Sequence, residues 1–159
     1  MRQIAVIRSG GQTGADRGAL EAAVAAGVPI AGWCPRGGLA EDFPDPPGLL
    51  AVYPTLVETP SDDPAQRTRW NVRDADATLI VVPGSAWHSP GTDLTRRVAL
   101  ELERPVFTLT GDDLSGLRAW LETVGGAVLN VAGPRESQAP GIQERTRRVV
   151  ASLLGGQPA

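Results

Sequence analysis

The fold is decided by the stretch Ile4-Ala5-Val6-Ile7-Arg8-Ser9-Gly10-Gly11-Gln12-Thr13-Gly14-Ala15-Asp16-Arg17. A short apolar run ends in a loop of glycine and hydroxyl residues, and an alanine-rich helical segment, Ala15–Ala26, follows directly. A helix N-terminus presents unpaired backbone N–H groups and the positive end of the helix dipole to one spot. Glycines let the backbone approach a phosphate closely. The stretch therefore predicts a site for a phosphate or another oxyanion.

Strand-like and helical segments alternate along the 159 residues. Apolar strands that alternate with one-sided helices predict a mainly parallel sheet covered on both faces. We therefore expect one doubly wound α/β domain over residues 1–155 and a short C-terminal tail over residues 156–159. The apolar runs are Ile4–Ile7, Pro29–Trp33, Leu49–Val57, Thr78–Val82, Val106–Leu109 and Ala127–Val131. The helical patterns are Ala15–Ala26, Pro64–Asp74, Asp93–Leu102, Leu114–Val124 and Ile142–Leu154.

Composition excludes several classes of site. All 15 basic residues are arginine, so neither a P-loop lysine nor a lysine Schiff base is available. One cysteine, Cys34, and one histidine, His88, exclude an internal disulfide and a multi-ligand Cys/His zinc site within the chain. The net charge of −3 and the few aromatic residues weigh against nucleic acid. No signal peptide or membrane-spanning run is recognisable, so we expect a cytoplasmic protein without a membrane partner.

Four loops that follow predicted strands carry the candidate ligand-binding residues. In an open α/β sheet, ligands bind at the carboxyl ends of the strands, and arginine grips oxyanions with two parallel hydrogen bonds. Any one of these loops, taken alone, is equally explained as a simple turn. The candidates are Ser9, Gly10, Gly11, Gln12, Thr13, Gly14, Asp16 and Arg17 in the first loop, Arg36 in the second, Pro83, Gly84, His88, Ser89, Gly91, Thr92 and Asp93 in the third, and Gly133, Arg135, Glu136 and Ser137 in the fourth.

Other features leave alternatives open. The segment Arg67–Asp76 is a polar helix, either a solvated face with local ion pairs or a wall of the ligand cleft. A dinucleotide fingerprint would need glycine where Gln12 stands. We assign no catalytic residue and no metal ligand.

Motifs along nearly the whole chain resemble those of the putative molybdenum carrier family, also described as a circularly permuted YpsA-like branch of the SLOG superfamily. The resemblance implies a Rossmann-like fold, a ligand that is nucleotide-derived or the molybdenum cofactor (a phosphorylated pterin), and a homo-oligomer. The motifs are Ser9–Arg17, Gly32–Gly37, Ala40–Asp42, Glu58-Thr59, Arg67-Thr68, Trp70–Asp74, Gly91-Thr92, Leu94-Thr95 and Leu129–Ser137.

The resemblance also bears on catalysis. The phosphoribohydrolases of the same superfamily carry Pro-Gly-Gly-x-Gly-Thr-x-x-Glu with a catalytic glutamate. Here Gly91-Thr92 is kept, but Thr95 stands at the glutamate position. The sequence therefore favours a binding or carrier protein for a phosphate-bearing small molecule. The alternative is a nucleotide or N-glycoside hydrolase that uses Asp16, Glu41 or Glu136. A third hypothesis, a single-stranded nucleic-acid binder, fits the charge poorly.

Overall fold

The central sheet of the computed structural model is parallel throughout, with strand order β2-β1-β7-β5-β6. The structure describes residues 4–155, so the tail expected at residues 156–159 lies outside the described part. The strands are β1 (Val6–Arg8), β2 (Ile30–Ala31), β5 (Ala77–Val81), β6 (Val106–Leu109) and β7 (Val128–Ala132). Every residue of β5 is buried, as expected of a central parallel strand covered on both faces.

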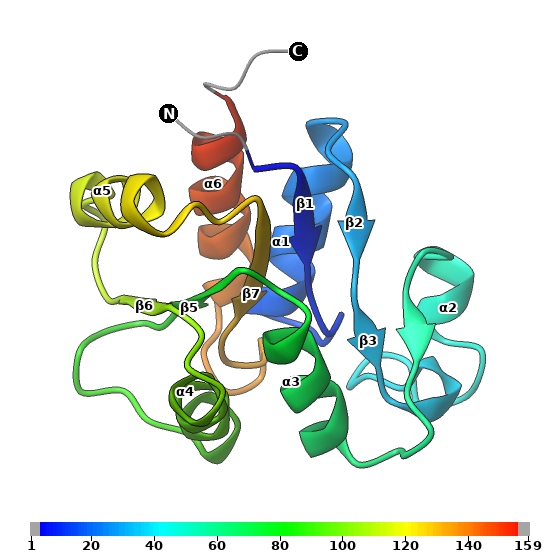
Figure 1. The fold of residues 1–159 in the computed structure, drawn as a ribbon. Coiled ribbons are helices and arrows are strands. Elements are labelled where there is room, and N and C mark those ends of the chain that lie inside the picture. The colour runs from blue at the N-terminus through cyan, green and yellow to red at the C-terminus, as the bar shows by residue number, and fades with distance from the viewer. Residues whose placement is uncertain (1–3, 156–159) are drawn as a thin grey trace.

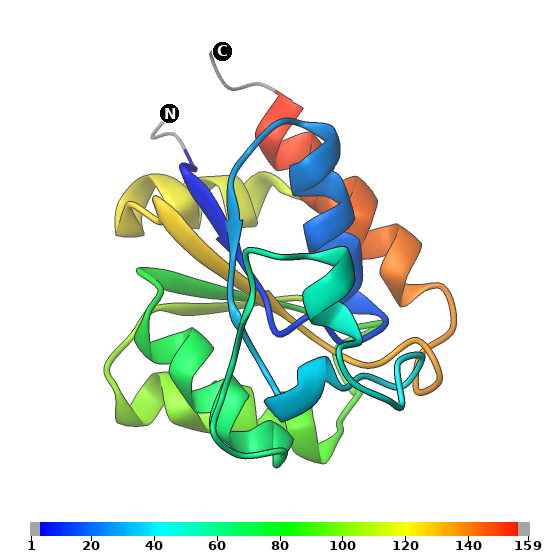
Figure 2. The ribbon, with the colours of Figure 1, turned by 90° about the vertical axis from the view of Figure 1, so that its right-hand side faces the viewer.

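Helices cover both faces of this sheet, which confirms the predicted doubly wound α/β architecture (Figures 1 and 2). One face packs against α1 (Ala15–Ala25), α5 (Ser115–Val124) and α6 (Ile142–Gly155) through the largest hydrophobic cluster. The other face carries α3 (Pro64–Arg73) and α4 (Pro90–Glu101), whose buried residues Val72, Val98 and Ala99 form a smaller cluster. Within residues 4–155 no helix is both long and apolar enough to cross a membrane.

A small lobe beside β1 holds a second sheet made of β3 (Trp33–Cys34) and β4 (Val57–Glu58), together with η1 (Arg36–Gly38) and α2 (Leu49–Val52). The apolar run 49–57, predicted as a strand, is instead one helical turn followed by a two-residue strand. The strand prediction was wrong because Pro54 interrupts the run and Gly48, at φ 47°, turns the chain into the helix.

The helix α4 begins earlier than predicted. The Ser89 side chain accepts a hydrogen bond from the Thr92 N–H, and Pro90 occupies the first helical position. The expected start at Asp93 is therefore wrong by one turn. The correction places Gly91 and Thr92 at the N-terminus of a twelve-residue helix rather than in a loop.

Close contact between α1 and α6 depends on Gly18. A Cβ at this position would collide with the backbone carbonyl oxygen of Gln143 on α6. We expect Gly18→Ala to lower the free energy of unfolding by about 1–2 kcal/mol, since overpacking outweighs the better helix propensity of alanine. Urea denaturation measures this loss. The matched control is Gly116→Ala in α5, where a Cβ meets only Phe107 at 3.7 Å; equal stability of the two variants would contradict the packing argument.

Candidate functional site

A cavity of about 280 Å³ lies past the carboxyl ends of β1 and β7. The loop after β1, the inner side of α3, the first turns of α4 and the end of β7 with the following loop form its walls. It gathers eight of the twenty residues predicted for the site, from three of the four predicted loops. These are Gly10, Gln12, Asp16, Ser89, Gly91, Thr92, Gly133 and Arg135.

The backbone N–H groups of the first glycine loop are largely occupied within the protein. Described acceptors are the Ser9 hydroxyl for Gly11, the Gln12 side chain for Thr13, the Gln143 side chain for Gly14 and the Pro134 carbonyl for Ala15. The expectation of free N–H groups is therefore wrong at these four positions. The loop acts as a buried scaffold that fixes Asp16 at the cavity.

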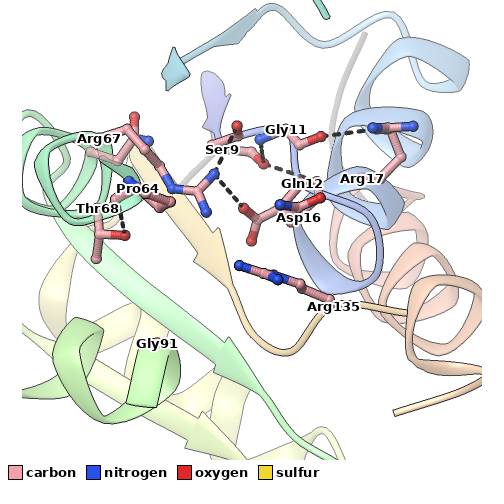
Figure 3. A network of polar contacts seen from close by, with 12 residues as sticks. Ser9, Gly11, Gln12, Asp16, Arg17, Pro64, Arg67, Thr68, Gly91 and Arg135 are labelled. Atoms are coloured by element: carbon pink, nitrogen blue, oxygen red, sulfur yellow. Dashed lines mark hydrogen bonds and ion pairs between the residues drawn. The ribbon is translucent and has the colours of Figure 1, made fainter. Parts of the chain in front are cut away.

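Most of the other predicted residues of the first loop are tied to neighbouring segments. Ser9 donates to the Asp16 carbonyl oxygen, and Thr13 donates to the Glu41 carboxylate at 2.6 Å. Arg17 makes two hydrogen bonds to Asp42, at 2.8 and 2.9 Å. It donates a third to the Gly11 carbonyl, which Figure 3 shows. None of these three side chains lines the cavity.

Gly11 also lies outside the cavity lining. Its φ is +78°, a conformation that favours glycine. A Cβ there would come within 2.9 Å of the Leu49 side chain in the small lobe. Backbone conformation and packing against the small lobe therefore explain why glycine stands at position 11.

The remaining predicted residues are dispersed. Arg36 lines a separate shallow hollow with Glu58 and Asp62. His88 is exposed, and its Nδ1 lies 3.4 Å from Asp93. Residues outside the cavity lining are Ser9, Gly11, Thr13, Gly14, Arg17, Arg36, Pro83, Gly84, His88, Asp93, Glu136 and Ser137.

A buried ion pair forms one wall of the cavity. The side chains of Asp16 and Arg67 are only 10% and 12% exposed, and the Asp16 carboxylate lies 3.6 Å from Nη1 of Arg67. The same Nη1 donates to the Gly10 carbonyl at 3.1 Å. Burial raises the pKa of Asp16 to about 6, although Arg67 and the Gln12 N–H act in the opposite direction.

Arg135 approaches this wall from the loop after β7. Figure 3 shows its side chain reaching toward Asp16, with Arg67 entering from α3 on the other side. The guanidinium of Arg135 makes no hydrogen bond with another described residue, and its described electrostatic partner is the Glu41 carboxyl group, whose pKa it helps to lower from a longer distance. The neighbouring Glu136 is not its partner, because that carboxylate accepts the N–H groups of Gly141 and Gln143.

Opposite this wall, the N-terminus of α4 borders the cavity. The N–H of Gly91 donates to no described residue, and the helix dipole adds partial positive charge at this end. A Cβ at Gly91 would meet nothing within 4 Å. Gly91 thus lies beside open space, and the buried Ser89 and Thr92 line the cavity next to it.

Several lining residues were missing from the predicted site. The sequence carried two signals for them: the polar helix, left open as a cleft wall, and the Arg67-Thr68 motif of the family resemblance. The roles of those on α3 and α4 depend on which face of α3 meets α4, and a single sequence does not reveal helix–helix packing. The missed polar residues are Arg67, Thr68, Asn71, Thr95, Asn130 and Gln138.

Comparisons with known proteins agree with this architecture. The chain is similar to the crystal structure of a putative molybdenum carrier protein from Syntrophus aciditrophicus SB, with a TM-score of 0.82 and 36% sequence identity. The similarity covers 94% of this chain and 96% of the other. Among curated proteins no match is found. The model of the circularly permutated YpsA SLOG family matches residues 7–154, and the chain therefore belongs to that family.

Proposed function

We propose that this protein binds, and carries, a phosphate-bearing small molecule in the cavity between α1, α3, α4 and β7. The observation that carries the proposal is Arg135, whose guanidinium reaches the cavity and makes no hydrogen bond with a described residue (Figure 3). Guanidinium groups bind phosphate through charge-assisted hydrogen bonds. The nearby N-terminus of α4 adds a second source of positive potential.

The charges around the cavity support an anionic ligand. Among the described lining residues three carry charge, namely Asp16, Arg67 and Arg135. Asp16 and Arg67 balance each other, and Arg135 attracts the Glu41 carboxylate only from a longer distance, so the N–H donors of the Arg135 guanidinium are left for the ligand. A volume of about 280 Å³ is at the lower end of small-molecule sites. A phosphate-bearing ligand of nucleotide size or smaller fits these features.

The carrier role has support from the Syntrophus aciditrophicus protein, which is described as a putative molybdenum carrier. Two ligand classes follow from this and from the family: a nucleotide-derived molecule and the molybdenum cofactor. Both carry a phosphate that Arg135 can bind. The cytoplasmic location and the homo-oligomer stay predictions, and analytical ultracentrifugation measures the latter.

Filling the cavity from α4 tests the proposal. We expect Gly91→Leu to weaken binding of AMP or inorganic phosphate at least tenfold, because the new side chain extends beside the cavity where glycine leaves open space. Isothermal titration calorimetry measures the affinities. The control is Gly84→Leu, at a glycine that is equally free of contacts but outside the cavity lining. Equal affinities of the two variants would place the ligand elsewhere.

A second candidate function is hydrolysis of a nucleotide or N-glycoside. Of the three carboxyl groups considered as its catalytic acid, Asp16 is the one that lines the cavity. Thr13 and Ser137 both donate to the Glu41 carboxylate, and backbone N–H groups occupy Glu136, whereas Asp16 lines the cavity. A carboxyl group with a pKa of about 6 is suited to proton transfer near neutral pH. Incubating AMP with the protein separates the two functions: released adenine or adenosine supports the enzyme, and unaltered bound AMP supports the carrier.

A further inference from the structure

The loop after β7, which carries Arg135, is fastened to two other segments of the chain. The N–H of Glu136, the next residue, donates to the Thr13 hydroxyl at 3.2 Å. The hydroxyl of Ser137, one residue further on, donates to the Glu41 carboxylate. Both hydrogen bonds fall within two residues of Arg135, so they limit where the backbone that carries its side chain can lie.

The Glu41 carboxylate connects these two contacts. It belongs to the segment between η1 and α2 in the small lobe. Thr13 donates its hydroxyl proton to this carboxylate at 2.6 Å. A hydroxyl has one proton and two lone pairs, so the Thr13 oxygen whose proton is committed to Glu41 presents a lone pair to the Glu136 N–H. One carboxylate therefore orders the loop after β7 twice, directly through Ser137 and indirectly through Thr13.

Glu41 is exposed, yet the backbone around it fixes its position. Its N–H donates to the Gln12 side-chain oxygen at 2.8 Å, and the same oxygen accepts the Thr13 N–H at 3.0 Å. The next residue, Asp42, receives two hydrogen bonds from Arg17 of α1. Exposed polar contacts contribute little when two free side chains must be ordered to form them. Here the backbone already orders the carboxylate, so it can act as a fixed anchor.

The charge of Glu41 has a second and opposing effect. The pKa of Glu41 is lowered chiefly by the hydrogen bonds from Ser137 and Thr13, and to a smaller extent by the attraction of Arg135. That attraction draws the guanidinium away from an anion in the cavity. It acts between exposed groups, however, where water and salt screen it. The hydrogen-bonded anchor therefore outweighs the competition for Arg135.

We propose that Glu41 is a positioning residue for anion binding, which holds the loop after β7 so that the Arg135 guanidinium stays at the cavity. This inference rests on the proposed function and gives the small lobe a part in it. A group that is held in its bound arrangement before the ligand arrives binds more tightly, because less freedom is lost on binding. The affinity for an anion should thus depend on a carboxylate that is not among the described residues lining the cavity.

Isothermal titration calorimetry with inorganic phosphate tests the proposal. Glu41→Ala should weaken binding about five- to tenfold. Glu41→Gln keeps a side-chain oxygen as acceptor for the two hydroxyls and removes only the charge, so its affinity should stay within twofold of wild type. The matched control is Glu58→Ala: that exposed carboxylate accepts the Gly37 N–H at 2.8 Å within the small lobe, and its loss should leave phosphate affinity unchanged.

Two further measurements separate positioning from a general loss of structure. In an Arg135→Ala background, Glu41→Ala should change phosphate affinity less than twofold, since no guanidinium is left to position. Amide hydrogen exchange of the free protein needs no ligand. The Glu136 N–H should exchange at least fivefold faster in Glu41→Ala than in wild type, whereas the Gly11 N–H, which donates to the Ser9 hydroxyl, should exchange as in wild type.

Every other outcome overturns a defined part of the account. Wild-type affinity in Glu41→Ala, or unchanged exchange of the Glu136 N–H, overturns the positioning role and leaves the proposed function standing. Tighter binding in both Glu41 variants, or equal losses in both, assigns the effect to charge. If Glu41→Ala does not fold, Ser137→Ala removes the direct hydrogen bond alone and should weaken binding two- to fivefold; no loss there also overturns the inference. If phosphate does not bind wild type at millimolar concentration, the proposed function falls as well.

Discussion

Replacing Arg135 with alanine is expected to weaken binding of AMP or inorganic phosphate by about ten- to a hundredfold. One guanidinium can donate two charge-assisted hydrogen bonds, each worth about 1.5–3 kcal/mol. A loss of about 1.4 kcal/mol of binding free energy weakens the affinity tenfold. Because Arg135 is an exposed residue, water takes over part of these hydrogen bonds in the free protein, and the net loss is expected to be about 1.4–2.8 kcal/mol, which is one to two factors of ten. Thermal stability should change little, since the guanidinium makes no hydrogen bond with a described residue and loses only a distant attraction to the exposed Glu41.

The matched control removes the same chemical group away from the cavity. Arg148 on α6 is 74% exposed and pairs with Glu144 at 3.1 Å, four residues earlier in the helix. We expect Arg148→Ala to bind both probes with wild-type affinity, as such exposed pairs contribute about 0–1 kcal/mol to stability. If Arg135→Ala also binds as tightly as wild type, the loop after β7 is not part of the site.

The second large effect concerns stability and pH. The Asp16 pKa lies near 6 in the folded protein, against 3.8 for an aspartate free in water, so between these values the native state holds a proton that the unfolded state has released. Stability from this group is complete below pH 4 and is lost as the pH rises through 6. A shift of about two pKa units corresponds to roughly 3 kcal/mol.

Asp16→Asn should therefore change the pH dependence more than any other property. The free energy of unfolding of Asp16→Asn minus that of wild type should grow by roughly 3 kcal/mol between pH 4 and pH 7. The comparison uses how the free energy of unfolding changes with pH, because its absolute value also contains the loss of the ion pair between Asp16 and Arg67. Urea denaturation at each pH measures it.

Asp45→Asn, on an exposed loop, is the control. Curves for Asp16→Asn that run parallel to wild type would contradict burial of an ionisable Asp16.

Sequence periodicity predicted the large elements because their cause is local. The run Val106–Leu109 coincides with β6, and α3 begins at Pro64, where the helical pattern begins, with Asp63 as its cap. The run at residues 49–57 misled because apolar content alone does not separate a buried helical turn from a strand. Only tertiary packing shows that Leu49 and Leu56 face one cluster while Val52 and Val57 are exposed.

The candidate site could be predicted in part for a similar reason. Glycines after predicted strands led to Gly10, Gly91 and Gly133, which line one cavity in the structure, since parallel strands bring their carboxyl ends together. The occupation of the first loop's N–H groups could not be read, because Gln143 and Pro134 reach it across more than a hundred residues of chain. The pairing of Arg67 with Asp16 likewise joins distant segments.

Native mass spectrometry of freshly purified wild type and Gly91→Leu, prepared in parallel and then incubated with AMP or inorganic phosphate, tests the central claim most directly. The account predicts that wild type carries a phosphate-bearing small molecule, either retained from the cell or taken up from the incubation. It predicts that Gly91→Leu, with its cavity filled, carries at most a tenth of that occupancy. Equal occupancy in both proteins, or none in wild type even at millimolar probe, would contradict a phosphate-binding cavity between α3 and α4.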